Sequence, residues 1–432
     1  MKGRRVNGPG MDIQKDGEAS VGKSHGPIHN MRNHPTETAA LVVLIVALFG
    51  GLIILLRPSP ESHRDFFQDY ASARNLLSGR PIYSRIDPAI YQFNAHPPTS
   101  VLLALPFAGM AYVPATVAWN LLSLVLLGGS LAVLISELRF DVSLSHLVLL
   151  SVALGLWPPL WFHLAQGQLG IPILFLLTLA WRATRHGRDT LAGGIIGLAA
   201  AIKIFPAVLI AYFIFRRRFR LAIAGILGFV LISAATLLIT GPETIRDYLI
   251  TVLPTLKGFN EYGRNASLTG FFSRLVSPSL AGVATLMASV LVAAIVWVRS
   301  TRADFDESFA LAITGTLLIT PLTWPHSLVI LLLPLAVYGA RLAYADSLSR
   351  WLAGAGWLLM AVPQTLLPGF DEYKTASAAV SLTVLSLNFY GLLAFFFAQA
   401  RLRRTCPLDG PESSRRISNP PETLLNPVDS AL

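Results

Sequence analysis

The chain has 432 residues, of which 53% are hydrophobic and only 13% are charged, and its formal net charge at pH 7 is +10. A soluble domain carries about a quarter charged residues, so this composition excludes a soluble globular enzyme and indicates that the bilayer solvates most of the chain. The basic residues lie in short clusters between apolar runs, such as 216–220, which is the positive-inside pattern of membrane proteins rather than a nucleic-acid-binding surface. Cys406 is the only cysteine, which excludes an intramolecular disulfide and a cysteine-based metal site.

The polar N-terminal residues 1–37 predict a disordered cytoplasmic tail, and they are too long and too mixed in composition for a signal peptide. Residues 38–400 form the predicted membrane domain, and residues 401–432 form a second disordered cytoplasmic tail. A transmembrane helix needs about 20 mostly apolar residues, and shorter runs can serve where other helices bury them. The predicted spans are 39–56, 114–136, 145–162, 168–182, 190–203, 205–215, 218–240, 279–298, 306–321, 325–343, 350–367 and 376–400.

Arginine clusters fix the predicted topology, because basic residues concentrate on the cytoplasmic side. Both predicted tails then lie inside, so the number of full spans is even. A further apolar run, 99–109, is short and bracketed by prolines, and we expect it to be a re-entrant or interfacial segment. The sequence therefore predicts an all-α polytopic membrane protein with about twelve transmembrane helices. The basic positions assigned to the cytoplasm are Arg182, Arg185, Arg188, 216–220, Arg299, Arg302, Arg341, Arg350, Arg401, Arg403 and Arg404.

Two long loops, 57–97 and 241–278, fall on the predicted outer side. The first loop carries Phe66, Tyr70 and Leu77 among polar residues at roughly helical spacing, which predicts an amphipathic helix lying on the membrane. No internal repeat of the kind that marks symmetric transporters is found.

Polar residues that could take part in catalysis or binding also collect on the predicted outer side. Each of them could instead have a purely structural role. Asp65 and Asp69 open the first loop helix, where an aspartate is often a cap. Lys203 ends an otherwise apolar run; a lysine there often reaches to the interface, but intramembrane ionisable groups are functional by default. His163 and His326 are each open to a structural hydrogen-bonding role, and Trp324 to membership of the interfacial aromatic belt.

Short motifs follow one another in a fixed order along residues 38–400. They are Asp65-Phe66 with Tyr70, Gly79, Pro81 and Tyr83, then His96-Pro97-Pro98, Gln166-Gly167-Gln168, Gly193-Gly194 with Lys203 and Pro206, Asn265 with Ser267 and Arg274, and Pro321 with Trp324, His326 and Pro334. This ordered set resembles glycosyltransferase family 87, bacterial integral-membrane enzymes of the GT-C class that include polyprenyl-phosphate-mannose-dependent α-mannosyltransferases. Family members often have Tyr where this chain has His96, and Asn where it has Leu169 and Gly170.

The resemblance implies a GT-C type fold and transfer of a hexose, mannose first among candidates, from a polyprenyl-phosphate donor to a lipid or glycan acceptor. The reaction then takes place on the extracytoplasmic face of a bacterial plasma membrane, with lipids as partners and no nucleic acid. It also implies that Asp65 is the general base of a single inverting displacement. No cofactor and no metal are expected, because the donor has no diphosphate for a metal to bridge.

The remaining candidate residues divide between the donor and the sugar. A lysine can pair with the donor phosphate as a point charge, so Lys203 is assigned to it, helped by Arg264 and His326. Asp69, one helical turn beyond Asp65, is expected to matter much less than Asp65. The predicted lining of the sugar or acceptor pocket is Asp69, Tyr70, His96, Gln166, Gln168, Asn265 and Trp324.

Two alternatives to an enzyme stay open at this point. The many spans also suit a transporter or lipid flippase, although the absent repeats and the amphipathic first loop argue against one. A non-catalytic assembly protein would predict that an isosteric change at Asp65 leaves function intact.

Overall fold

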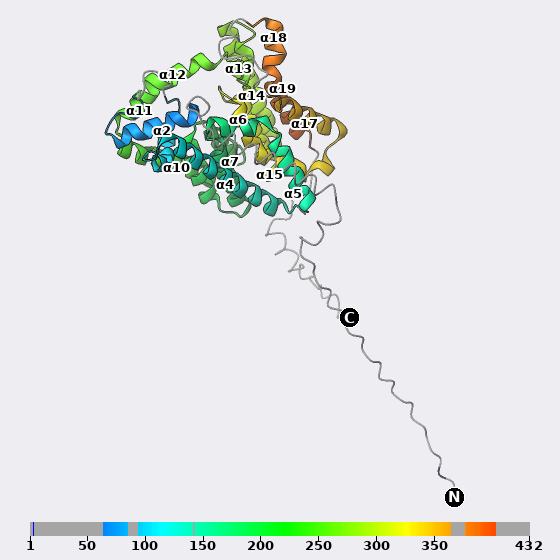
Figure 1. The fold of residues 1–432 in the computed structure, drawn as a ribbon. Helices are drawn as coiled ribbons and strands as arrows, with labels where there is room; N and C mark the ends of the chain where they lie inside the picture. Colours follow the sequence, from blue (N-terminus) through cyan, green and yellow to red (C-terminus); the bar gives the residue numbers. More distant parts are fainter. Residues whose placement is uncertain (1–2, 4–63, 85–93, 141–142, 364–375, 403–432) are drawn as a thin grey trace, which may run out of the picture.

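The computed structural model describes residues 3, 64–84, 94–140, 143–363 and 376–402 (Figure 1). Within these ranges every regular element is a helix or a helical turn, and no strand occurs. The predicted first span, 39–56, and nearly all of both predicted tails lie outside the described residues.

The helices before residue 241 include the candidate spans of the N-terminal half. They are α2 (Arg64–Leu77), α3 (Pro98–Ala104), α4 (Tyr112–Leu138), α5 (Leu144–Gly155), α6 (Pro158–Gln166), α7 (Gly170–Arg185), α8 (Asp189–Ile202), α9 (Val208–Phe215) and α10 (Phe219–Thr240). Single 3-10 turns, Leu105–Phe107 and Phe205–Ala207, follow α3 and precede α9.

After residue 241 the chain first forms short helices in the second predicted outer loop and then returns to longer ones. The helices are α11 (Glu243–Asp247), α12 (Leu253–Thr255), α13 (Leu268–Ser273), α14 (Pro278–Arg302), α15 (Phe305–Ile319), α16 (Leu332–Ala340), α17 (Ser347–Met360), α18 (Ala378–Leu382) and α19 (Leu387–Ala400). A π-helical turn, Tyr248–Val252, precedes α12, and 3-10 turns occupy Leu256–Phe259, Pro325–Leu331, Leu342–Tyr344 and Val384–Ser386.

Four helical segments of the described chain are long and apolar enough to cross a membrane: α4, α10, α14 and Ala378–Ala400. Helices α5 and α6 pass the same test together but are bent by 62° at the break between them. The run predicted as the span 145–162 is therefore formed by two helices with a bend between them. Pro158 and Pro159 lack a backbone N–H, which ends α5 and suits the first turn of α6.

Shorter apolar helices correspond to the other predicted runs. Asp189–Ile202, Phe205–Phe215 and Pro325–Ala340 fall on the predicted spans 190–203, 205–215 and 325–343. Pro98–Phe107 falls on the run 99–109, and at about 15 Å it is too short to cross a hydrocarbon core of about 30 Å.

Helix α2 is the predicted helix of the first outer loop, and other parts of the protein pack against it. Its apolar residues Phe66, Tyr70 and Ala73 are buried, and the ring of Phe66 stacks on Trp119 with centroids 5.3 Å apart. Its polar residues Gln68, Asp69 and Ser72 are buried as well. Protein therefore covers both the apolar and the polar face of α2.

Helix α8 packs against α10 so closely that backbone atoms of the two helices are in contact. A Cβ added to Gly193 would lie 2.3 Å from the carbonyl oxygen of Leu221, and one added to Gly197 would lie 2.5 Å from that of Gly225. Only residues without a side chain allow this approach. The close packing fixes the far end of α8, where Lys203 follows.

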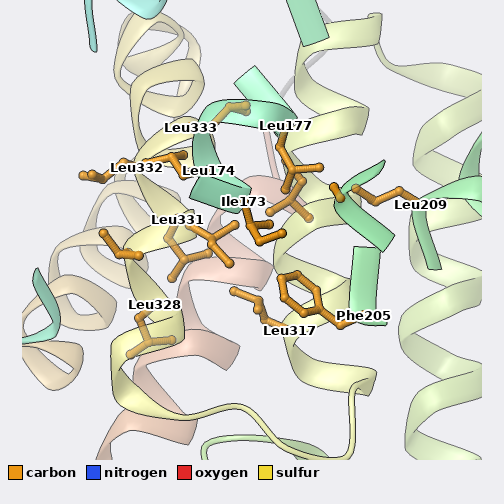
Figure 2. Packing of buried hydrophobic residues seen from close by; sticks show 14 of the residues in the cluster. Ile173, Leu174, Leu177, Phe205, Leu209, Leu317, Leu328, Leu331, Leu332 and Leu333 are labelled. Atoms are coloured by element: carbon orange, nitrogen blue, oxygen red, sulfur yellow. The ribbon is translucent and has the colours of Figure 1, made fainter. Parts of the chain in front are cut away.

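The core lies where α7, α9, α15 and α16 meet. Figure 2 shows Ile173, Leu177, Leu209, Leu317 and Leu331 pointing toward one another from these elements and the turn before α16. All five are essentially inaccessible to solvent.

Arginines assigned to the cytoplasm that lie within the described ranges meet acidic residues at one end of the helices, where ion pairs join them. Helix α7 begins two residues after Gln168 and ends in this group at Arg185, so its 16 residues separate the two regions by about 24 Å. The pairs are Arg185 with Glu137 and Asp306, Arg299 with Glu307, Arg341 with Asp304, and Arg401 with Asp346.

Candidate active site

Asp65 is the second residue of α2, and its carboxylate is held by a residue of the same helix that also contacts the segment before α3. Gln68, one helical turn on, donates from Nε2 to Asp65 Oδ1 at 2.8 Å. The Oε1 of Gln68 accepts the backbone N–H of Ala95 at 3.0 Å, which ties α2 to the segment before α3. Burial raises the pKa of Asp65, and Gln168, His96 and Lys203 lower it in part.

Gln168, between α6 and α7, and Lys203, directly after α8, extend this group. Lys203, in the cap position after α8, donates from Nζ to Gln168 Oε1 at 3.3 Å. Because that oxygen is occupied by the ammonium, the amide N–H₂ of Gln168 is left to donate to the Asp65 carboxylate, with which it is hydrogen-bonded. The structure thus brings Asp65 together with Gln168 and Lys203, which both lie more than 100 residues further along the sequence.

Gly167 explains how Gln168 reaches this position. Its φ of +62° ends α6 in the left-handed region, and its carbonyl oxygen accepts the indole N–H of Trp119 at 2.8 Å. A Cβ added there would lie 2.5 Å from Cβ of Phe66. The position therefore needs glycine both for its backbone conformation and for its contact with α2.

We expect Gly167→Ala to lower the apparent melting temperature in detergent clearly more than Gly79→Ala does. Both glycines have φ near +65°, so alanine costs about 1–2 kcal/mol at either position. At Gly79 nothing lies within 4 Å of the added Cβ, whereas at Gly167 it meets Phe66. Thermal unfolding of the two purified variants measures the difference, and equal shifts would contradict the close contact.

Asp69 does not cap α2, because it is the sixth residue of the helix, in its second turn. Its Oδ1 accepts Ser100 Oγ at 2.7 Å and Asn94 Nδ2 at 3.2 Å, and its Oδ2 lies 2.8 Å from His96 Nδ1. Asp69 as a whole residue is 3% exposed. The capping alternative considered for Asp69 is therefore wrong, and its partners come from the segment that ends the first outer loop.

His326 lies in an aromatic layer beside Lys203. Its ring is 5.7 Å from that of Phe162 and 6.3 Å from that of Trp324, nearly parallel to the latter. The guanidinium of Arg264 lies over the ring of Phe162, 5.9 Å from its centroid. His326 interacts electrostatically with Lys203, and within the described chain neither of its ring nitrogens has a hydrogen-bond partner. Phe162 thus lies between Arg264 and His326, and His326 in turn interacts with Lys203.

His163 has the structural role that the sequence left open for it. It is fully buried, and its Nε2 accepts the backbone N–H of Ile171 at 3.3 Å. This bond fixes the start of α7 next to Gln168.

Asn265 is occupied by hydrogen bonds to the backbone. Its Nδ2 donates to the carbonyls of Asn260 and Pro321 at 3.2 and 2.9 Å, and its Oδ1 accepts the N–H groups of Ser267 and Thr323 at 3.2 and 3.0 Å. A side-chain amide has no further capacity to bind a sugar. Asn265 instead fixes the segment that leads to Trp324 and His326.

Two other predicted pocket residues are not brought into the group by their hydrogen bonds. The hydroxyl of Tyr70 donates to the carbonyl of Met110 at 2.8 Å and accepts from Arg74. Gln166, the last residue of α6, is half-buried and makes no hydrogen bond with Asp65 or Lys203.

Three residues of the group were missed by the sequence reasoning: Gln68, Asn94 and Ser100. Gln68 lies three residues after Asp65, so the helical spacing of the polar face was the signal for it. Nothing in the local sequence marks Asn94 and Ser100, because they reach Asp69 across 25 and 31 residues.

Comparison with known proteins gives matches over most of the chain. The model of glycosyltransferase family 87 matches residues 94–325, more than half of the sequence, and includes His96, Gln168 and Lys203. A polyprenol-phosphate-mannose-dependent alpha-(1-2)-phosphatidylinositol pentamannoside mannosyltransferase of Mycobacterium tuberculosis is 24% identical over 397 residues, which cover 85% of this chain and 90% of the relative.

A second relative, from Mycolicibacterium smegmatis, is a polyprenol-phosphate-mannose-dependent alpha-(1-2)-phosphatidylinositol mannoside mannosyltransferase. It is 27% identical over 377 residues, which cover 78% of this chain and 83% of the relative. Since the family model covers more than half of the sequence, the chain belongs to glycosyltransferase family 87.

Proposed function

We propose that this protein transfers a mannosyl group from a polyprenyl-phosphate donor to a glycolipid or glycan acceptor, with inversion, on the extracytoplasmic face of the plasma membrane. The observation that carries the proposal is the pair of hydrogen bonds that connects Lys203 to Gln168 and Gln168 to Asp65. It sets a cation for a phosphate and a buried carboxylate for a proton side by side. The dependence of both relatives on polyprenol-phosphate-mannose supports the donor.

Asp65 is the general base of the proposed reaction. The acceptor hydroxyl oxygen forms a bond to the anomeric carbon, the bond from that carbon to the phosphate oxygen breaks, and the hydroxyl proton passes to Asp65. Polyprenyl phosphate leaves with the electron pair. Because the leaving group is a stable anion, the base is the group that the protein must supply.

Lys203, His326 and Arg264 form the proposed donor-phosphate side. Lys203 lies in the cap position after α8, where its ammonium reaches the site from the end of an apolar helix. His326 has unpaired ring nitrogens in the described part of the chain, and Arg264 extends the same side through Phe162. Three potential donors around one anion suit a phosphodiester.

The proposed acceptor-binding side of the site consists of Asp69, His96 and Gln168, and Trp324 supplies an apolar surface beside them. Both relatives are named for phosphatidylinositol mannoside acceptors. We therefore propose a glycolipid of that class as the first acceptor to test. No metal or cofactor forms part of the proposal.

Incubating the purified protein with radiolabelled polyprenyl-phosphate mannose and a phosphatidylinositol mannoside tests the function. The expected result is a labelled glycolipid larger by one hexose. Label that stays on the donor while the protein moves that lipid between vesicle leaflets would instead support a flippase.

The proposed fold is a GT-C type bundle of about twelve spans. Support comes from the helices that fall on eleven of the twelve predicted runs, and from the separation of the arginine end from Asp65 by the length of α7.

We expect a cysteine at Ser84→Cys to react with a membrane-impermeant thiol reagent in intact cells, and one at Phe219→Cys to stay unlabelled. Both positions are exposed in the fold, so sidedness alone decides access. The Cys406→Ser background removes the only native cysteine. Permeabilised cells, in which both should react, are the control, and the reverse labelling in intact cells would overturn the extracytoplasmic site.

A further inference from the structure

A groove of about 580 Å³ lies where α13, the first half of α14 and the end of α15 meet. Along α14 its lining begins at Pro278 and continues through Gly282 and Thr285 to Ser289, at the spacing of one helix face. The helix rises about 16 Å from Pro278 to Ser289, roughly half of a hydrocarbon core of about 30 Å. In the proposed topology the groove therefore extends from the head-group region into the outer leaflet.

Four hydroxyl groups line this groove, and within the described ranges none of them has a hydrogen-bond partner. They belong to Thr269 and Ser273 of α13 and to Thr285 and Ser289 of α14. By contrast, the hydroxyls of Thr316 in α15 and of Thr320 directly after it donate to carbonyl oxygens four residues earlier, at 2.8 and 2.7 Å. Because an unpaired hydroxyl is costly at membrane depth, the groove suits an occupant that offers hydrogen-bonding groups.

The groove face of α14 differs from the face that the helix presents to the bilayer. In the same turns Val283, Met287 and Val290 are exposed large apolar residues, as expected for a surface against lipid chains. On the groove face Gly282 is exposed, and no atom lies within 4 Å of a Cβ added to it. The groove therefore combines open space with polar groups, which distinguishes it from a general lipid-facing surface.

The back of the groove is the segment that leads to Trp324 of the candidate site. Pro321 lines the groove, and its carbonyl oxygen accepts Asn265 Nδ2 and Ser267 Oγ, each at 2.9 Å. Asn260 lines it as well, and its carbonyl oxygen accepts the same Asn265 amide at 3.2 Å. The groove and the site therefore share this segment, which the Asn265 side chain holds in place.

Resting on the proposed mannosyl transfer, we infer that this groove binds the glycolipid acceptor through the hydroxyl groups of its head and guides that head toward Trp324. A polyprenyl chain has no hydrogen-bonding group and would leave the four hydroxyls unpaired, as would an acyl chain. The inositol and sugar rings of a phosphatidylinositol mannoside carry hydroxyls that both donate and accept. Pockets for small ligands enclose about 300–1,000 Å³, so the groove holds part of the head rather than the whole lipid.

Two groove variants test the inference. Thr285→Val combined with Ser289→Ala removes two hydroxyls at nearly constant volume, and it should raise the apparent KM for phosphatidylinositol mannoside roughly ten-fold, the scale of two modest hydrogen bonds. Gly282→Leu places a side chain in the groove without a clash, and leucine favours a helix more than glycine does. It should raise the acceptor KM at least as much. Initial rates of the purified full-length protein give both KM values, and the donor KM should stay parental.

Each variant has a matched control. Thr240→Val removes a hydroxyl at the end of α10 that already donates to the carbonyl of Thr236 at 3.1 Å. Gly128→Leu makes the same glycine change on α4, where again no atom lies within 4 Å of the added Cβ. Both controls should keep the parental KM for acceptor and donor. A raised donor KM in Gly282→Leu would assign the groove to the polyprenyl chain instead, and an unchanged acceptor KM in both groove variants would reject the acceptor site.

Thermal unfolding in detergent separates this inference from the proposed function, because a ligand that binds the folded state raises the melting temperature. Phosphatidylinositol mannoside should stabilise the parent and Gly128→Leu but not Gly282→Leu, and phosphatidylcholine should stabilise none of them. A parent that transfers no mannose but shows this pattern would remove the proposed function and keep the groove as a glycolipid site. Equal stabilisation of Gly282→Leu by phosphatidylinositol mannoside would reject the groove, whether or not the parent is active.

Discussion

Asp65→Asn is expected to reduce mannosyl transfer by at least about a hundred-fold, since a general base contributes about 10²–10⁴ in rate. The carboxamide keeps the shape of the side chain and can still accept the hydrogen bond from Gln68, but it cannot take a proton. Expression and donor binding should be retained. Turnover of the purified variant and parent, assayed side by side, measures the effect.

Asp189→Asn is the control for this change, because Asp189 also lies in the first turn of its helix and is bonded to Arg218 at 3.2 Å. It should leave turnover within a few-fold of the parent, since a partly exposed ion pair contributes only about 0–1 kcal/mol. Near-parental turnover in Asp65→Asn itself would remove Asp65 from the mechanism and favour a transport or assembly function.

Lys203→Met is expected to raise the apparent KM for the donor roughly ten- to hundred-fold. Methionine keeps much of the volume, and the loss of a charge-assisted hydrogen bond to the phosphate corresponds to about 1.5–3 kcal/mol. Initial rates over a series of polyprenyl-phosphate mannose concentrations give the value.

Lys257→Met, at an exposed lysine of the turn after α12, should leave the donor KM unchanged. If Lys203 acts only on Asp65, the variant will show an unchanged donor KM with an acid limb moved to higher pH. That outcome would transfer the phosphate role to His326 and Arg264.

The helices could be predicted from hydrophobicity because apolar length is a local property. The predicted runs 218–240 and 279–298 correspond to α10 and α14 within a few residues at each end. The bend between α5 and α6 was missed although Pro158 and Pro159 marked it. An apolar run indicates which residues the bilayer can solvate, but it does not show whether the helix axis bends within the run.

The site was predictable where residues meet at helix ends. Alternating topology placed Asp65, Gln168 and Lys203 on one side, and the fold brings them into contact. The part played by Asp69 was not predictable, because helical spacing alone made it a minor neighbour of Asp65. Its partners Asn94 and Ser100 come from a segment whose path depends on the whole bundle.

The breaks between helices have a consequence for how such an enzyme can diversify. Gln168, Lys203 and His326 all lie at breaks, between α6 and α7, after α8, and before α16. Exchange of a side chain there removes no hydrogen bond from a helix interior and leaves the apolar stretches intact. Contacts with the substrates can therefore change at a few such positions at low cost to insertion and folding, because the hydrophobic runs are left as they are.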